Sequence, residues 1–153
     1  DGFAVLSLDE ALALRNSGYQ QAILLLEGVF SADELQGVSQ NKISVVVHCD
    51  QQVDMLLNAK LAHPVSVHLK LNTGMNRLGF LPERFPQVLA RLQSSDAVAG
   101  ITLMTHFATA DEPLGIAQPL ALFNQTTAHL DLPKSLANSA ASLRAFLRNP
   151  AKL

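Results

Sequence analysis

The sequence predicts an α/β fold, a partial (β/α) barrel of about six parallel strand–helix units. Two observations lead to this fold class. Short apolar runs typical of buried strands alternate along the chain with segments that carry apolar residues at helical spacing. The strand-like runs are also nearly continuous in apolar residues, which indicates that both faces of the sheet are covered. Regular alternation of this kind is typical of parallel strands joined by right-handed crossovers.

Six strands are expected, and each ends where polar or turn-forming residues follow. The clearest strand alternates strictly, with Val67, Leu69 and Leu71 on one face and His68 and Lys70 on the other. The apolar face then meets helices, and the other face looks into the barrel. The six expected strands are residues 2–6, 22–27, 43–48, 65–71, 101–106 and 135–138.

The expected helices between the strands begin at capping signals. Ser7, followed by Glu10 three residues later, is typical of a capping box. Ser31 and Asp50 are expected to cap the second and third helices, and Pro82 to stand in the first turn of the fourth. The six expected helices begin at Ser7, Ser31, Asp50, Leu81, about Ile116 and Ser139, and the last stops before Pro150.

An open doubly wound sheet is the alternative to a barrel. The G-x-G-x-x-G fingerprint of a dinucleotide-binding sheet does not follow the first strand. Six units are fewer than the eight of a closed TIM-like barrel, and the chain begins without a Met in a strand-like run. We therefore expect residues 1–153 to form a single partial barrel domain that is a segment of a longer protein.

The composition gives no reason to expect nucleic acid or a membrane as a partner. Hydrophobic residues make up 48% of the chain and charged residues 16%, and the formal net charge is −2. This charge gives no electrostatic reason to expect nucleic acid or an anionic membrane surface, and no apolar run approaches the roughly 18 residues that span a bilayer. The single cysteine, Cys49, cannot form an internal disulfide, which favours a reducing compartment such as the cytoplasm.

Two basic residues stand where the fourth expected strand meets its loop, the place where barrel enzymes keep their active groups. Lys70 lies on the inward face near the end of this strand, and the turn around Gly74 and Gly79 returns Arg77 toward the barrel mouth. A lysine on an inward face is costly unless it is neutral, paired or modified. Lys70 is therefore a Schiff-base lysine, a carbamate or a salt-bridged support, unless it simply reaches solvent at the strand end.

Two later strand ends add further candidates. His106 points into the mouth near Lys70 if the apolar face of its strand is the outer one; the alternative is a hydrogen-bonded structural histidine. Asn138 and Ser139 open a helix among small residues, where free N–H groups favour an anion; the alternative is an ordinary N-cap. No histidine pair has metal-ligand spacing such as H-E-x-x-H, so we expect no metal site.

Residues 70–80 read KLNTGMNRLGF, and two further blocks stand at residues 104–112 and 137–141. The first resembles the signature K-x-D-T-G-M-x-R-L-G-x of bacterial alanine racemases, and the other two are similar to two further blocks of that family in the same order. The resemblance implies a TIM-like barrel that binds pyridoxal 5′-phosphate. It also implies a cytoplasmic homodimer that interconverts L- and D-alanine and so supplies D-alanine for peptidoglycan. Other pyridoxal-phosphate barrels, including related amino-acid racemases, match these blocks less well.

The resemblance also implies roles for single residues. Lys70 matches a lysine that is often carbamylated and then orients the arginine matching Arg77. That arginine contacts the phenolic oxygen of the cofactor and the carboxylate of the substrate. His106 matches a histidine that supports an arginine beneath the pyridine nitrogen, and Asn138 and Ser139 match residues beside the cofactor phosphate.

Both acid–base groups of the family lie outside the matching blocks. The Schiff-base lysine belongs to a K-A-N-A-Y-G-H-G block that does not occur here, and the second base is a tyrosine of a C-terminal β domain that we expect to be absent. The only tyrosine, Tyr19, matches neither, and Asn72 stands where the family usually has Asp. We therefore expect no catalytic residue in this segment and no racemisation by the segment alone. The alternatives are a non-catalytic module that binds a cofactor or phosphate, and an enzyme that uses Lys70 itself as the Schiff-base lysine.

Overall fold

The computed structural model describes residues 2–148, in which six strands and six helices alternate. Pro150, expected beyond the last helix, lies outside the described residues. The strands are β1 Gly2–Val5, β2 Ala22–Leu25, β3 Ser44–Val47, β4 Val65–Lys70, β5 Val98–Met104 and β6 Lys134–Ser135. The helices are α1 Leu8–Asn16, α2 Glu34–Gln40, α3 Asp50–Asn58, α4 Phe85–Gln93, α5 Ala117–Thr127 and α6 Ser139–Arg148.

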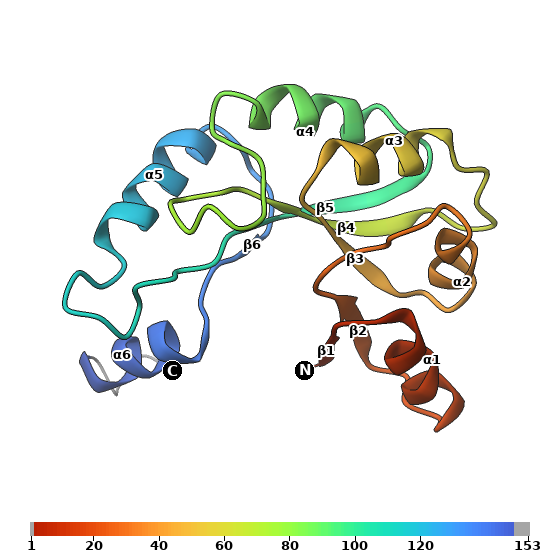
Figure 1. Cartoon of the computed structure of the whole chain (residues 1–153), viewed down its shortest axis with the longest axis horizontal. Helices are drawn as coiled ribbons and strands as arrows, with labels where there is room; N and C mark the ends of the chain where they lie inside the picture. Colours follow the sequence, from red (N-terminus) through yellow and green to blue (C-terminus); the bar gives the residue numbers. More distant parts are fainter. Residues whose placement is uncertain (1, 149–153) are drawn as a thin grey trace.

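The strands form one parallel sheet in which each strand pairs with the next along the chain, in the order β1-β2-β3-β4-β5-β6. Figure 1 shows this sheet curving into an arc, with helices α1 to α5 arranged around its outer side. A doubly wound sheet reverses its strand order at a switch point, and this sheet does not. The predicted partial barrel is confirmed, and the open doubly wound alternative is wrong.

The hydrophobic core lies between the outer face of the sheet and the helices. In β4 the side chains of Val65, Val67 and Leu69 are buried, whereas Ser66 on the opposite face is exposed. Helix α4 covers this part of the sheet with four buried side chains, Phe85, Val88, Leu89 and Leu92. Each such side chain contributes about 1.5–3 kcal/mol when it is removed from water. The strict alternation of β4 therefore decides which of its side chains face the helices and which face the interior of the barrel.

Helix α1 begins as the sequence predicts. The Ser7 hydroxyl accepts a hydrogen bond from the Glu10 N–H at 3.3 Å, and Glu10 Oε2 accepts one from the Ser7 N–H at 3.3 Å. This reciprocal pair is a capping box, and it satisfies N–H groups that have no partner inside the helix.

Two other expected helix starts are wrong. Helix α2 begins at Glu34, whose Oε2 accepts hydrogen bonds from the N–H groups of Phe30 at 2.7 Å and Ser31 at 3.4 Å. A carboxylate, and not the Ser31 hydroxyl, therefore satisfies the donors ahead of this helix. Helix α4 begins at Phe85, and Pro86, not Pro82, lies in its first turn. Residues 82–84 form a separate turn before the helix.

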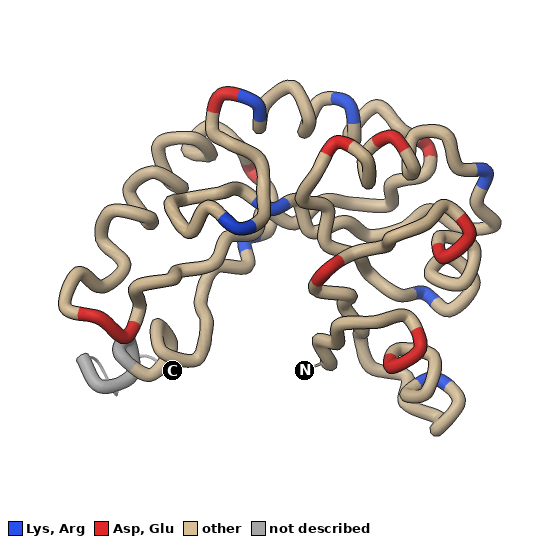
Figure 2. Tube along the Cα trace, in the orientation of Figure 1, with Lys and Arg blue, Asp and Glu red and all other residues tan. Residues whose placement is uncertain are grey.

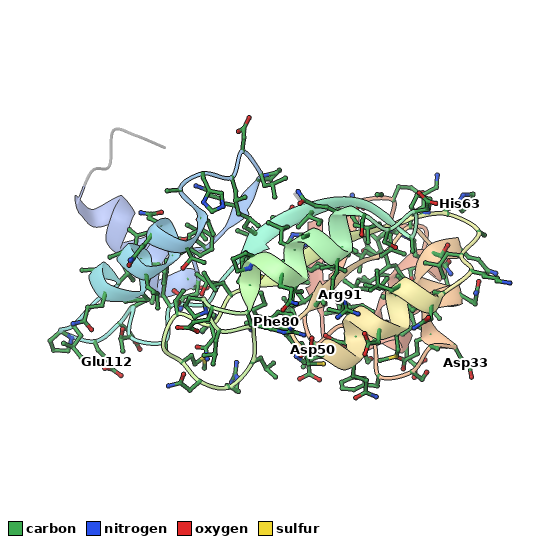
Figure 3. The ribbon with its side chains drawn as sticks, turned by 90° about the horizontal axis from the view of Figure 1, so that it is seen from above. Asp33, Asp50, His63, Phe80, Arg91 and Glu112 are labelled. Atoms are coloured by element: carbon green, nitrogen blue, oxygen red, sulfur yellow. The ribbon has the colours of Figure 1, made fainter. Side chains whose placement is uncertain are left out.

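The expected cap at Asp50 is also wrong. Asp50 is the first residue of α3, and Cys49 takes the N-cap position without a side-chain hydrogen bond. The Asp50 carboxylate instead pairs with Arg84 at 3.0 Å and lies 3.9 Å from Arg91 of α4. Figure 3 shows the side chains of Asp50 and Arg91 meeting between α3 and α4. The carboxylate is used between two helices, so it is not free to cap its own.

Charged positions of both signs are interspersed along the described trace in Figure 2. Among the described residues, no helix is long and apolar enough to cross a membrane.

Candidate functional site

A cavity of about 590 Å³ opens where the strands end. Its walls come from residues at the carboxyl end of β1 to β5 or within two residues beyond it, together with Phe30 and the loop that follows β4. The polar lining is Glu27, His48, Lys70, Arg77 and His106, and the apolar lining is Leu6, Leu26, Phe30, Leu78 and Met104. Since the carboxyl ends of parallel strands meet at one edge, residues far apart in sequence come together here.

Lys70 is the last residue of β4, and 8% of its surface is exposed. Burial lowers its pKa, and the charge of Arg77 lowers the pKa further. Among the described residues, the ion pairs join Arg84 and Arg91 to acids on α3, and none reaches Lys70. The buried amine therefore lies near a second cation and makes no ion pair with a described carboxylate, which is an arrangement suited to an anion.

His106 lines the same cavity from the segment after β5, the strand that pairs with β4. It lies two residues beyond the end of β5, because this strand starts and ends earlier than the predicted 101–106. Burial lowers the pKa of His106 first, and the charges of Lys70 and Arg77 lower it further. A depressed pKa keeps the imidazole neutral near pH 7, so that one ring nitrogen accepts and the other donates. The prediction that His106 points into the mouth near Lys70 agrees with this geometry.

Arg77 reaches the cavity from a loop that is closed at its base. The N–H of Asn72 donates to Phe80 O at 2.8 Å, and the N–H of Phe80 donates to Lys70 O at 2.9 Å. Gly79 has a φ of 110°, and a Cβ there would lie 2.9 Å from Lys70 O. A side chain at residue 79 would therefore force the loop away from the end of β4, and Arg77 with it.

Asn72 shapes the middle of the same loop. Its Oδ1 accepts hydrogen bonds from the N–H groups of Gly74 at 3.0 Å and Asn76 at 3.1 Å. Its Nδ2 donates to Asn76 Oδ1 at 3.0 Å, and Asn76 adopts a positive φ of 57°. An aspartate at residue 72 keeps both acceptor contacts, but it has no N–H to donate to Asn76.

The part of the wall that comes from the ends of β2 and β3 depends on a residue that the sequence does not single out, Gln52. Gln52 of α3 is 3% exposed, and its Nε2 donates to Glu27 O at 2.8 Å and to Val29 O at 3.3 Å. Its Oε1 accepts a hydrogen bond from the His48 N–H at 2.9 Å. Gln52 therefore fastens the loop after β2 to the end of β3. No local pattern marks it, although Glu27 and His48 share with Lys70 a position at a strand end.

Asn138 and Ser139 do not line this cavity. Asn138 Oδ1 accepts a hydrogen bond from the Ala141 N–H at 2.9 Å, and Asn138 Nδ2 donates to Phe107 O at 2.9 Å. The side chain of Asn138 thus caps α6 and holds it to the segment after β5, as the N-cap alternative requires. Ser139 begins α6, where first-turn N–H groups have no partner inside the helix. The predicted strand 135–138 is limited to Lys134–Ser135, so both residues follow a short loop.

Comparisons with known proteins agree on one family. Residues 1–152 match the family model described as alanine racemase, N-terminal domain. The chain is 49% identical over 143 residues to the catabolic alanine racemase of Klebsiella aerogenes, a match that covers 94% of this chain and 40% of that protein. It is 52% identical over 147 residues to the alanine racemase of Nitrosospira multiformis, covering 94% and 41%.

A solved structure gives the same result. The crystal structure of the biosynthetic alanine racemase from Pseudomonas aeruginosa matches with a TM-score of 0.86 and 42% sequence identity. The match covers 94% of this chain and 40% of that one. The chain thus spans about two fifths of the length of these relatives.

Proposed function

Because the chain belongs to the alanine racemase family, we propose that the protein containing it interconverts L- and D-alanine with pyridoxal 5′-phosphate. In this proposal residues 1–153 are a single domain, part of the N-terminal (β/α) barrel. The full protein is a cytoplasmic homodimer that supplies D-alanine for peptidoglycan. The observation that carries the proposal is the cavity at the strand ends, where Lys70, Arg77 and His106 converge.

The chemistry of this cavity fits an anionic cofactor and an amino-acid carboxylate. The Arg77 guanidinium lines the cavity and can donate to anionic oxygens, and the depressed pKa of His106 leaves its ring able to donate as well as accept. Pyridoxal phosphate, when bound, supplies an electron sink that stabilises negative charge on the α-carbon. The residues of this chain hold and orient the anionic groups around it.

Arg77 is the residue proposed to contact both the phenolic oxygen of the cofactor and the carboxylate of the substrate. A guanidinium stays charged at every working pH and donates in a planar fork that matches a carboxylate. Its neighbours Lys70 and His106 both have lowered pKa values. Arg77 is the arginine of the cavity lining, and its fork can offer two parallel N–H donors to one carboxylate.

Lys70 is proposed to be carbamylated. A neutral amine adds to CO₂ with loss of one proton, and the product is an N-carboxylate that carries a negative charge. The lowered pKa of Lys70 makes the neutral amine available, and the new charge balances Arg77. Without modification, the charged amine destabilises the fold near pH 7. This cost falls as pH rises toward the unfolded-state pKa, because the folded pKa is the lower one.

We expect ¹³C-labelled bicarbonate at pH 8 to produce a carbamate signal in the NMR spectrum of the full-length protein. The Lys70→Met variant should lack the signal, and the Lys60→Met variant, changed at an exposed lysine, should keep it. Bicarbonate should also raise the Tm of the wild-type protein and not that of Lys70→Met. A signal that persists in Lys70→Met would contradict the assignment.

Three residues are proposed to act less directly. His106 supports an arginine beneath the pyridine nitrogen. Asn138 and Ser139 lie beside the cofactor phosphate, Asn138 by capping α6 and Ser139 at the positive end of its dipole.

The two acid–base groups that racemisation needs are proposed to lie outside these residues. The cavity lining contains neither a tyrosine nor a second lysine, and Tyr19 lies beyond the end of α1. Mixed with pyridoxal phosphate and L-alanine in D₂O, the 153-residue chain should show no loss of the α-proton signal by NMR. The full-length protein should exchange it completely. Exchange by the chain alone would sink this proposal, and borohydride trapping of cofactor on Lys70 would favour Lys70 as the Schiff-base lysine.

A further inference from the structure

We propose that Thr105 is a positioning residue for this site. Its hydroxyl couples the loop that carries Arg77 to the strand end that carries His106. This coupling fixes the distance between the Arg77 and His106 side chains in the cavity. The inference rests on the proposed function only for its catalytic readout. The coupling itself is a property of the fold.

The hydroxyl of Thr105 sits in a directed chain of hydrogen bonds. Thr105 Oγ1 donates to Leu71 O at 2.9 Å and lies 2.7 Å from Thr73 Oγ1. A hydroxyl has a single hydrogen. Since Thr105 gives its hydrogen to Leu71 O, the hydrogen between the two hydroxyls comes from Thr73. The order is therefore Thr73 to Thr105 to Leu71.

These hydrogen bonds tie the segment that leads to Arg77 and the segment that leads to His106 through one residue, Leu71. The Leu71 N–H donates to Met104 O at 2.8 Å, so both polar groups of Leu71 are bound by the two residues that precede His106. Leu71 also forms the bridge with Phe80 that closes the base of the Arg77 loop. A shift at Leu71 is thus passed to both ends of that loop.

Burial makes the coupling stiff. Thr105 is 3% exposed, Thr73 7% and Leu71 1%. Water cannot easily replace a lost hydrogen bond here, so an orphaned Leu71 carbonyl must find a new partner by moving. Thr105 itself is held from the other side, because its N–H donates to Ser135 O at 3.2 Å. The Arg77 loop is therefore the part that shifts.

The test uses the full-length protein and four variants. Thr105→Val replaces the hydroxyl with a methyl group of similar shape, and Thr105→Ser keeps the hydroxyl. Thr73→Val removes the first donor and leaves Leu71 O bound. Thr127→Val is the matched control, because Thr127 is fully buried on α5 and donates to Phe123 O at 2.8 Å, away from the cavity.

We expect Thr105→Val to lower kcat/KM for alanine by about 10- to 100-fold, with KM raised, because a small displacement of a positioning group has effects of that size. Thr105→Ser should stay within about threefold of wild type, and Thr127→Val within about twofold. The kcat/KM of Thr73→Val should lie between the values of Thr105→Val and Thr105→Ser. A double variant that carries both Thr73→Val and Thr105→Val should have a kcat/KM no lower than that of Thr105→Val alone, since the two hydroxyls act through one chain of hydrogen bonds.

Amide hydrogen exchange provides a readout that does not depend on activity. Thr105→Val should speed exchange of the Asn72 and Phe80 amides by about tenfold, while the Val53 amide in α3 changes no more than in Thr127→Val. If the wild-type protein does not racemise alanine, the proposed function fails and exchange alone decides the coupling. Uniform exchange changes, or kinetics equal to those of Thr127→Val, would overturn the inference. If Thr105→Val does not fold, Thr73→Val decides by the same two criteria.

Discussion

Replacing Arg77 with alanine in the full-length protein lowers kcat/KM for alanine by about 10²–10³-fold, the expected loss for a donor aimed at charge in an active site. The reason lies in the electrostatics of the cavity. Burial lowers the pKa of Lys70 and of His106, whereas a guanidinium is a permanent cation whose planar fork matches a carboxylate. Racemisation of L-alanine, followed by polarimetry across a range of substrate concentrations, measures the effect.

Two further variants sharpen this test. Arg77→Lys keeps a charge but loses the planar fork, so we expect it to recover only part of the activity. Arg91→Ala removes an arginine of α4 that pairs with Asp54 at 2.7 Å on the outer surface, and it should change kcat/KM by less than about twofold. Equal losses in Arg77→Ala and Arg91→Ala would show that Arg77 does not touch the substrate.

Gly28→Ala is expected to destabilise the protein by about 2–5 kcal/mol, the sum of a strained backbone and an overpacked core. Gly28 has a φ of 73°, and a Cβ there would overlap Val46 O and lie 2.5 Å from Gln52 Nε2. Gln52 cannot move aside without losing its hydrogen bonds to Glu27 O and Val29 O. Urea denaturation followed by circular dichroism measures the free energy of unfolding.

Gly18→Ala is the matched control for this substitution. Gly18 also has a positive φ, 88°, but nothing lies within 4 Å of a Cβ built there. Only the backbone strain remains, so the expected cost is about 1–2 kcal/mol. Equal losses in the two variants would mean that the Gln52 contacts do not hold the loop after β2 in place.

The features that the sequence predicts well are those with a local physical cause. Period-two alternation in β4 assigns Val67 and Leu69 to the core, and both are buried. The convergence of Lys70 and His106 follows from the same logic, because parallel strands bring their carboxyl ends to one edge. Neither inference requires knowledge of a distant partner.

The features that the sequence misses depend on partners far along the chain. Gln52 bonds to Glu27 and Val29, which lie 25 and 23 residues away, and nothing around Gln52 signals that its amide is buried. The cap predicted at Asp50 fails for the same reason, since the Asp50 carboxylate pairs with Arg84, which lies just before α4. Glu34 is a different case, because its partners are local. Its carboxylate accepts the hydrogen bonds from the N–H groups ahead of α2, a role that the sequence assigns to the Ser31 hydroxyl.

The sequential strand order also bears on how the chain folds. Gly2 pairs with Ala22, 20 residues on, and Ser66 pairs with Gly100, 34 residues on. Each pairing therefore closes a loop of similar, modest length, and the entropy cost of closure rises only slowly with that length. When a strand leaves the ribosome, the strand with which it pairs has already been synthesised, because that strand precedes it in the sequence. The arc of the sheet can thus grow one strand–helix unit at a time, in the order of synthesis.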